Sequence, residues 1–264
     1  MTQQFEVRDR ITCTIGEDGV AHVRLARADK LNALDMPMFE AIAEAGHALN
    51  EARGLRAVVL AGEGRAFCAG LDLAAMHALL GPDARPLAER SHGNANLFQH
   101  AAMVWRKLPV PVIAAIHGVC LGGGLQIAAG ADIRVVASDA RLSIMETRWG
   151  IVPDMGHFVL WRSLVREDAL RELTYTHREF SGQEAVALGF ATHVHTDPLA
   201  HASTIASAIA GLSPHAIRTA KALFNRTADL DEDAILLAES IEQAKLIGSR
   251  NQLEAVRAGL AGET

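Results

Sequence analysis

Residues 116–137 read IHGVCLGGGLQIAAGADIRVVA, in which three consecutive glycines separate two apolar runs. Glycine lets the main chain turn tightly and approach another group closely, because it carries no Cβ. We expect a helix to begin at Gly123, so that its first N–H groups and the positive end of its dipole point outward. The apolar runs predict strands on either side of the glycines, over Pro109 to Ile116 and Ile133 to Ala137.

A second glycine-rich passage, residues 61–73, reads AGEGRAFCAGLDL and follows a predicted strand from Leu55 to Leu60. Neither passage has the G-x-G-x-x-G spacing of a dinucleotide site, because Phe67 and Ile127 fall where the third glycine belongs. Each cluster by itself is typical of a tight turn between strand and helix. Two such loops together can supply the backbone N–H donors of an oxyanion hole.

Strand and helix patterns alternate through most of the chain. Two strand-like runs, Ile11 to Ile15 and Val20 to Leu25, flank a GEDG turn and indicate a hairpin. Helices are predicted over 36–53 and 95–107, and a further strand begins near Leu142. Strands that alternate with helices are typical of a largely parallel sheet in an α/β fold.

Strand signals stop at Leu199, which divides the chain into a core domain, residues 1–198, and a helical region, residues 199–264. The helical patterns of the second region cover residues 200–210, 214–228 and 231–260. The last of these helices carries an apolar stripe that suits contact with a partner subunit. The stripe consists of Leu236, Leu237, Ile241, Ala244 and Ile247.

Composition narrows the classes of protein that need consideration. The chain has 264 residues, of which 50% are hydrophobic and 21% charged, so it can bury a sizeable core. A net charge of -6 argues against nucleic-acid binding, which needs a basic surface. Residues 1–10 are polar and no apolar signal region follows, and apolar runs such as Val110 to Ile116 are too short to span a membrane. We therefore expect a cytoplasmic protein that binds neither nucleic acid nor membrane.

Metal and hydrolase motifs are missing from the sequence. Cys13, Cys68 and Cys120 are widely spaced, which predicts free thiols and no zinc site. The twelve histidines include no H-E-x-x-H pattern. Ser181 has no nucleophile-elbow context, and with Glu184 it forms the pattern of a helix capping box.

Several segments resemble the signature segments of the crotonase (enoyl-CoA hydratase/isomerase) superfamily. The resemblance is carried by LARADKLNALD at 25–35 and by the two glycine-rich passages, in the same order and at similar separations. FSGQEAVALGFATHV at 180–194 and LSPHAIRTAKALFN at 212–225 extend it over nearly the whole chain. It implies a crotonase-like spiral of ββα units with a C-terminal helical trimerisation region. It also implies a coenzyme A thioester as substrate, no permanently bound cofactor, and a homotrimer or a dimer of trimers.

The resemblance also implies roles for individual residues. The oxyanion donors would be the backbone N–H groups of Leu71 and Gly123. Arg27 or Lys30 would reach a phosphate of coenzyme A. The residues expected along the coenzyme A arms are Arg27, Lys30, Leu31, Ala66, Cys68, Ala69 and Gly70.

Three further positions concern proton transfer. Hydratases of the family carry a glutamate at the position of Gln126, whose amide cannot accept a proton near neutral pH. Glu146 matches the second hydratase glutamate, and Asp154 follows eight residues later. The dienoyl-CoA isomerase branch is similar here, because it has acids at both positions, although it has a third where Gln126 stands. A dehalogenase branch has its nucleophilic aspartate at position 154, but it has tryptophan at position 146.

Two interpretations of the acidic pair remain open. Burial and mutual repulsion can raise and separate the pKa values of Glu146 and Asp154, which would suit them to giving and taking protons. Alternatively, Glu146 pairs with Arg148 or Arg162 and Asp154 caps a helix that begins near Met155.

The expected function is hydration or double-bond isomerisation of an unsaturated acyl-CoA, with Gln126 able to orient a water that Glu146 activates. The alternatives are thioester hydrolysis, dehalogenation or decarboxylation through Asp154, or binding of acyl-CoA without catalysis. Residues 76–99 are expected to form part of the acyl pocket.

Overall fold

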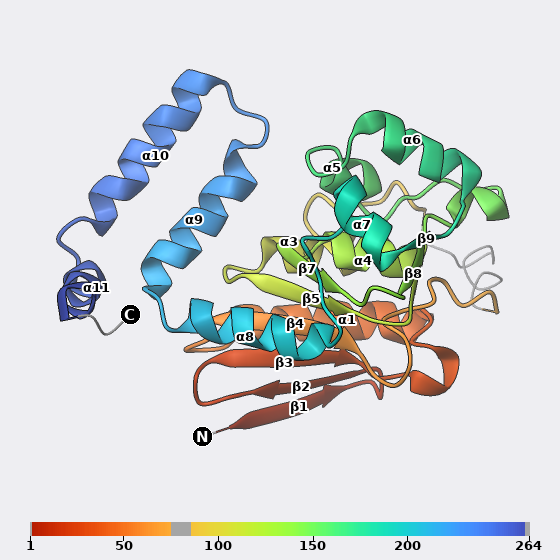
Figure 1. Cartoon of the computed structure of the whole chain (residues 1–264), viewed down its shortest axis with the longest axis horizontal. Helices are drawn as coiled ribbons and strands as arrows, with labels where there is room; N and C mark the ends of the chain where they lie inside the picture. The colour runs from red at the N-terminus through yellow and green to blue at the C-terminus, as the bar shows by residue number, and fades with distance from the viewer. Residues whose placement is uncertain (1, 75–85, 262–264) are drawn as a thin grey trace.

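The computed structural model describes residues 2–74 and 86–261, and its main feature is a seven-stranded sheet with the order β1-β2-β3-β4-β5-β7-β10 (Figure 1). The first three strands pair antiparallel, and the pairs from β3 to β10 are parallel, as the alternating pattern predicts. The strands are β1 Gln3–Val7, β2 Ile11–Ile15, β3 Val20–Leu25, β4 Ala57–Gly62, β5 Val112–Ile116, β7 Ile133–Val136 and β10 His193–Val194.

The hairpin of β2 and β3 is confirmed, with Cys13 opposite Val23. β1 was not predicted, because most of its side chains are polar and exposed and give no strand pattern. It pairs with β2, and Phe5 and Val7 pack against the core.

A second, three-stranded sheet lies in the order β6-β8-β9, with β6 Val119–Leu121, β8 Arg141–Ser143 and β9 Phe180–Ser181. β6 leads directly into helix α4, Gly123–Ala129, whose start at Gly123 agrees with the sequence prediction. Gly122, between them, has a φ of +50° and donates its N–H to the carbonyl of Ser143. This bond fixes the glycine turn against β8, which precedes Glu146 in the chain.

Helices cover both faces of the large sheet. Helices α1, Met36–Glu51, and α3, Leu97–Lys107, pack against one another and share the main apolar core with the sheet. Helix α8, Pro198–Ala210, packs on β4, β5 and β7 through a second apolar cluster that includes Ala202 and Ala206. The sheet is therefore buried from two sides, as expected for parallel strands.

Side-chain caps fix several helix starts. Asp35 accepts the N–H of Met38 at the start of α1, and Asn96 forms a capping box with Gln99 at the start of α3. The capping box predicted from Ser181 begins α7. The remaining helices of this part are α5 His157–Trp161, α6 Glu167–Thr176 and α7 Gly182–Leu188.

The last three helices are α9 Pro214–Thr227, α10 Glu232–Leu246 and α11 Arg250–Ala261. Figure 1 shows them leading away from the body formed by the two sheets. The prediction of one helix over 231–260 was wrong, because the chain breaks at Gly248, where φ is +76°. Lys221 of α9 is buried and donates to the carbonyls of Trp105 and Val110 and to Asp132, which holds α9 to the core.

Helix α8 belongs by sequence to the predicted helical region, residues 199–264, but it packs on the core sheet. The division at residue 198 stays a prediction. Within the described residues, no helix is both long and apolar enough to cross a membrane.

Candidate active site

The two glycine-rich passages lie against each other. Cys68 donates its N–H to the carbonyl of Val119, and Leu121 donates its N–H to the carbonyl of Cys68, in a parallel bridge between the loops. A Cβ on Gly124 would lie 2.5 Å from the carbonyl oxygen of Cys68. Only glycine allows the two main chains to approach this closely.

The backbone N–H groups of Leu71 and Gly123 are available for a ligand. Leu34 donates to the carbonyl of Gly70 and accepts from the N–H of Asp72, and this parallel pairing turns the N–H of Leu71 away from Leu34. Gly123 is the first residue of α4, so its N–H has no partner within the helix. Within the described part of the chain, neither N–H donates a hydrogen bond.

The two donors lie close together. A Cβ built on Gly70, which has a φ of +87°, would lie 3.7 Å from the nitrogen of Gly123. Both loops line one cavity of about 250 Å³. Its lining residues are Ala69, Gly70, Leu71, Leu73, Leu121, Gly122, Gly123, Met145, Glu146, Trp149 and Ile151.

Glu146 is the acidic group in this lining, and it begins the short 3-10 helix Glu146–Trp149. Its side chain is only 8% exposed. The Oε1 atom accepts a hydrogen bond of 2.5 Å from Nε2 of Gln126, and Oε2 is buried without a partner among the described residues. Burial raises the pKa of Glu146, the charge of Asp154 raises it further, and the Gln126 amide opposes the rise.

Asp154 lies on the loop that follows Glu146, between the buried residues Pro153 and Met155. Its side chain keeps contact with solvent, but the apolar surroundings raise the pKa of its carboxyl by removing part of its hydration. The charge of Asp154 also raises the pKa of Glu146.

The purely structural alternative for this acidic pair is wrong. Arg148 stacks over Trp149, and Arg162 pairs with Asp229, so neither arginine neutralises Glu146. Helix α5 begins at His157 with Gly156 as its N-cap residue, and no side chain caps it. Asp154 is therefore not a helix cap.

Gln126 connects the segments that carry the two acids. It lies in α4, is 2% exposed, and donates to Glu146 through its amide nitrogen. Its amide oxygen accepts the N–H of Met155 at 2.8 Å. Both polar atoms of the side chain thus have protein partners, and the expected role of orienting a water has no support in these contacts.

The residues expected to hold coenzyme A lie around the first glycine-rich loop. Arg27 donates to Asp72 and to the carbonyl of Ala33, so its guanidinium already has partners in the fold. Lys30 is exposed, and the carbonyl of Leu31 accepts the N–H of Ala69. The other expected residues are buried or half-buried: Ala66, Cys68, Ala69 and Gly70. Their contact with coenzyme A stays a prediction.

Asn32 supports this loop, although the sequence analysis did not single it out. It is fully buried, and its side-chain nitrogen donates to the carbonyls of Glu63, Ala66 and Phe67. Its φ is +57°, a conformation that asparagine tolerates better than most residues. The feature of the sequence that could have indicated this role is a polar residue between Leu31 and Leu34.

Residues 76–85 of the expected acyl pocket lie outside the described residues, and residues 86–99 do not line the cavity. The part of the chain that the structure describes contains no cluster of three or more histidine, cysteine or acidic residues suited to a metal ion. Its cysteines are free, as predicted.

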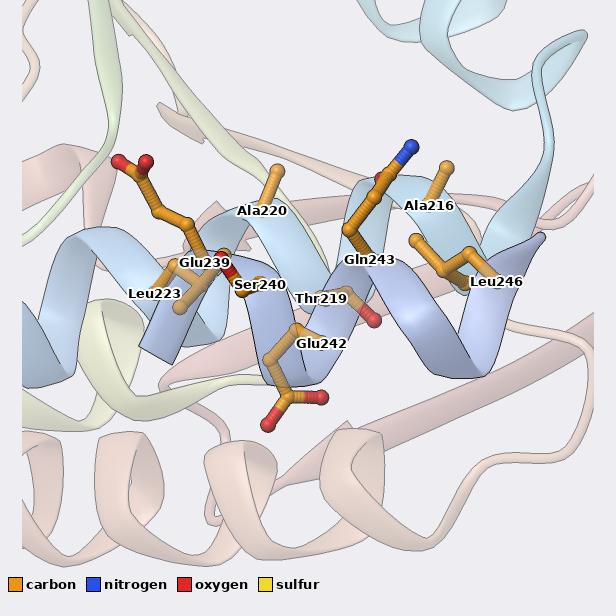
Figure 2. A pocket seen from close by; sticks show the side chains of 9 residues that line it. All are labelled: Ala216, Thr219, Ala220, Leu223, Glu239, Ser240, Glu242, Gln243 and Leu246. Carbon is orange, nitrogen blue, oxygen red and sulfur yellow. The ribbon is translucent and has the colours of Figure 1, made fainter. Parts of the chain in front are cut away.

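A larger cavity, about 530 Å³, lies between α9 and α10 (Figure 2). The carboxylates of Glu239 and Glu242 point in different directions in Figure 2, and Glu242 pairs with Arg226 and Lys245. The smaller cavity is the candidate active site, because Glu146 and the two available backbone N–H groups line it. The larger one is lined by Ala216, Thr219, Ala220, Leu223, Glu239, Ser240, Glu242, Gln243 and Leu246.

Comparisons with known proteins identify the family of the chain. The family model described as enoyl-CoA hydratase/isomerase matches residues 16–260. The mitochondrial Δ(3,5)-Δ(2,4)-dienoyl-CoA isomerase of Mus musculus is 31% identical over 240 residues, which are 87% of this chain and 73% of that protein. The peroxisomal enzyme of the same name from Arabidopsis thaliana is 31% identical over 250 residues, or 92% and 90% of the two chains.

Solved structures show the same fold. A putative enoyl-CoA hydratase from Streptomyces coelicolor A3(2) is 31% identical and superposes with a TM-score of 0.88 over 96% of this chain and 92% of that chain. The α/β crotonase fold expected from the sequence is confirmed. With the family match over nearly its whole length, the chain belongs to the enoyl-CoA hydratase/isomerase family and is an acyl-CoA-processing enzyme of that type.

Proposed function

We propose that this enzyme isomerises an unsaturated acyl-CoA, converting a 3,5-dienoyl thioester into the 2,4-dienoyl thioester. The observation that carries the proposal is the acidic pair. Glu146 and Asp154 both have raised pKa values, and the charge of Asp154 contributes to the rise at Glu146. Glu146 lines a cavity that also contains two backbone N–H groups without partners in the described chain. Relatives named dienoyl-CoA isomerase support the same choice of reaction.

The proposed reaction moves one proton along the acyl chain. The thioester oxygen accepts hydrogen bonds from the N–H groups of Leu71 and Gly123, which form the oxyanion hole. One carboxylate removes a proton from C2, giving a trienolate, and the other carboxyl returns a proton to C6. The double bonds shift from C3 and C5 to C2 and C4, so substrate and product have the same atoms.

The environments of the two carboxyls suit one of them to act as the base and the other as the acid. Asp154 is the more exposed, and when it is ionised its charge raises the pKa of Glu146. The pair therefore favours one charged and one neutral carboxyl, the states that a base and an acid require.

Hydration is the second candidate, because Glu146 lines the cavity and its Oε2 has no partner within the described residues. A relative named methylglutaconyl-CoA hydratase, from Mus musculus, is 31% identical over 251 residues. Water addition needs a second group to hold the water, and Gln126 does not line the cavity. Isomerisation is therefore better supported.

The proposal includes three further expectations. The coenzyme A thioester is a substrate that binds and leaves, with no resident cofactor, and we expect the exposed Lys30 to meet one of its phosphates. The assembly is a homotrimer or a dimer of trimers. The location is cytoplasmic, which cell fractionation would test.

A substrate panel tests the reaction. Purified enzyme is incubated with 2-enoyl-, 3-enoyl- and 3,5-dienoyl-CoA in heavy-oxygen water, and products are analysed by mass spectrometry and ultraviolet absorbance. We expect the 3,5-dienoyl thioester to give a conjugated product of unchanged mass without heavy oxygen. A product heavier by one labelled water would establish hydration instead. Release of free coenzyme A would establish thioester hydrolysis.

Two variants test the acids. Glu146→Gln and Asp154→Asn are each expected to lower kcat by about 10²- to 10⁴-fold, the usual contribution of a general acid or base. Asp139→Asn, which makes the same change on an exposed turn, should leave kcat unchanged. Full activity in both active-site variants would mean that the acidic pair does not transfer protons.

A further inference from the structure

We propose that Gln126 is a positioning residue, which holds the carboxyl group of Glu146 and the backbone next to Asp154 in one fixed arrangement. The inference rests on the proposed function, because it assigns a role in that reaction to a residue that does not line the cavity. Gln126 hydrogen-bonds to Glu146 itself and to the backbone N–H of Met155, the residue that follows Asp154. It acts through the two acids and need not touch the substrate.

The contacts fix which way the side-chain amide of Gln126 points. The backbone N–H of Met155 can only donate, so the atom facing it at 2.8 Å must be the amide oxygen. The NH₂ group then faces Glu146, at 2.5 Å from Oε1. The orientation follows from the chemistry of the partners and not from the assignment of two similar atoms.

This arrangement is buried and shared with the oxyanion loop. The side chains of Gln126 and Glu146 are 2% and 8% exposed, so water competes little with the hydrogen bond between them. The side chain of Met155 packs on the turn that carries the proposed oxyanion donor, since a Cβ on Gly123 would lie 3.0 Å from its sulfur. A shift of Gln126 would therefore displace both an acid and the segment beside the thioester.

A neutral amide at position 126 can donate a hydrogen bond to Glu146 without adding a second titrating group, which an acid cannot do. A glutamate at position 126 could still accept the N–H of Met155, but its other oxygen would face Oε1 of Glu146 at the same short distance. Two carboxylate oxygens can approach so closely only if a proton lies between them. Glutamine avoids this sharing, and it leaves Glu146 as the single titrating group at this end of the pair.

Direct titration of Glu146 tests the proposal. The protein is labelled with ¹³C at the glutamate side-chain carboxyl carbon, and the Glu146 resonance is assigned as the one missing in Glu146→Gln. We expect its titration midpoint to move upward in Gln126→Met, because the amide donor that stabilises the charged form is lost. In Gln126→Glu we expect a larger upward shift and two coupled steps.

The kinetic expectation is specific to positioning. In Gln126→Met, kcat for the dienoyl thioester should fall by about tenfold or more while KM changes little, because Gln126 supplies no cavity lining. With Glu146 as the neutral acid, its ionisation sets the alkaline limb of the pH–rate profile, and this limb should move in the same direction as the titration midpoint. Gln183→Met, the same change on the exposed face of α7, should alter neither measurement.

The outcomes separate the possible failures. A folded Gln126→Met protein with an unchanged Glu146 midpoint and unchanged kcat would overturn the proposal. If Gln126→Met does not fold, Gln126→Glu decides, because it keeps the acceptor for Met155, and an unchanged midpoint there would also overturn it. An upward shift in an enzyme that does not isomerise dienoyl-CoA would support the positioning role and refute the proposed reaction.

Discussion

At the scale of single residues, the site keeps an ionisable group where it is poorly hydrated. Glu146 is buried, and its Oε2 atom has no hydrogen-bond partner in the described chain. A buried polar atom without a partner costs about 1 to 3 kcal/mol. Such a cost is typical of groups that are retained for chemistry and not for stability.

The raised pKa of Glu146 predicts that the stability of the protein depends on pH. Because the folded protein raises the pKa of Glu146, the folded state keeps its proton at pH values where the unfolded state has lost it. Stability therefore falls as the pH rises from the ordinary value of 4.5 through the raised one. Glu146→Gln removes this loss and should raise stability at pH 7 by about 1 kcal/mol.

Thermal unfolding at several pH values checks the prediction. The stabilisation should shrink toward zero below about pH 4, where the glutamate is protonated in both states. Glu6→Gln, the same change on the exposed β1 strand, should shift Tm little at any pH. A Glu146→Gln protein that is less stable than the wild type at pH 7 would show that the charged form is favoured by the fold.

At the scale of elements, the contact between α1 and α3 explains a glycine that helix propensity alone would disfavour. Gly46 lies inside α1, where alanine would ordinarily be better by about 1 kcal/mol. A Cβ at this position, however, would lie only 2.1 Å from Cγ2 of Val104 on α3. The glycine is therefore explained by the close packing of the two helices.

We predict that Gly46→Ala lowers the free energy of unfolding by about 1 to 3 kcal/mol, the usual effect of overpacking. Val104→Ala combined with Gly46→Ala should recover part of this loss, because it removes the clashing methyl group. Urea unfolding monitored by circular dichroism measures both. In Gly259→Ala, where nothing lies within 4 Å of the new Cβ, stability should not fall.

The sequence predicted the elements that bury a continuous apolar face. The parallel strands are apolar runs, with β4 and β5 buried at every position, so their pattern is visible without the fold. β1 has an exposed, polar pattern and becomes a strand only because β2 offers it an edge. The break at Gly248 was missed because the apolar spacing continues on both sides of it.

The chemistry of the site was also partly predictable. The resemblance to the family implied roles for Glu146, Asp154 and the two backbone donors, whereas the residue types alone left two interpretations of the acidic pair open. The partners of Gln126 were not predictable, because Glu146 and Met155 lie 20 and 29 positions away along the chain. Residues so far apart in the sequence come into contact only when α4 and the later loop pack together.

At the scale of the whole molecule, the last helices present large apolar side chains to solvent. Leu237 on α10 is 62% exposed, and Ile247 beyond it is 66% exposed. Large apolar side chains that are exposed in such number are typical of an interface. The other members of this face are Leu236, Ile241, Leu253, Val256 and Leu260.

We predict that the enzyme forms a homotrimer or a dimer of trimers through this face. Light scattering on a size-exclusion column should give three or six times the chain mass for the wild type. Leu237→Asp with Ile241→Asp should shift the mass toward one chain, because two charges cannot be buried unpaired at an apolar interface. Ser207→Asp, on the exposed side of α8, should leave the mass unchanged. A monomeric wild type would contradict the prediction.

The proposed thioester anchor is made of main-chain atoms, which has a consequence for how this enzyme tolerates change. The amides of Leu71 and Gly123 are specified by the path of the chain and not by any particular side chain. The half-exposed Leu71 can be replaced by other residues without altering the donor. Gly124 cannot, because a Cβ there would clash with Cys68. The position that must be kept is therefore one without a side chain, and a search for reactive side chains does not find it.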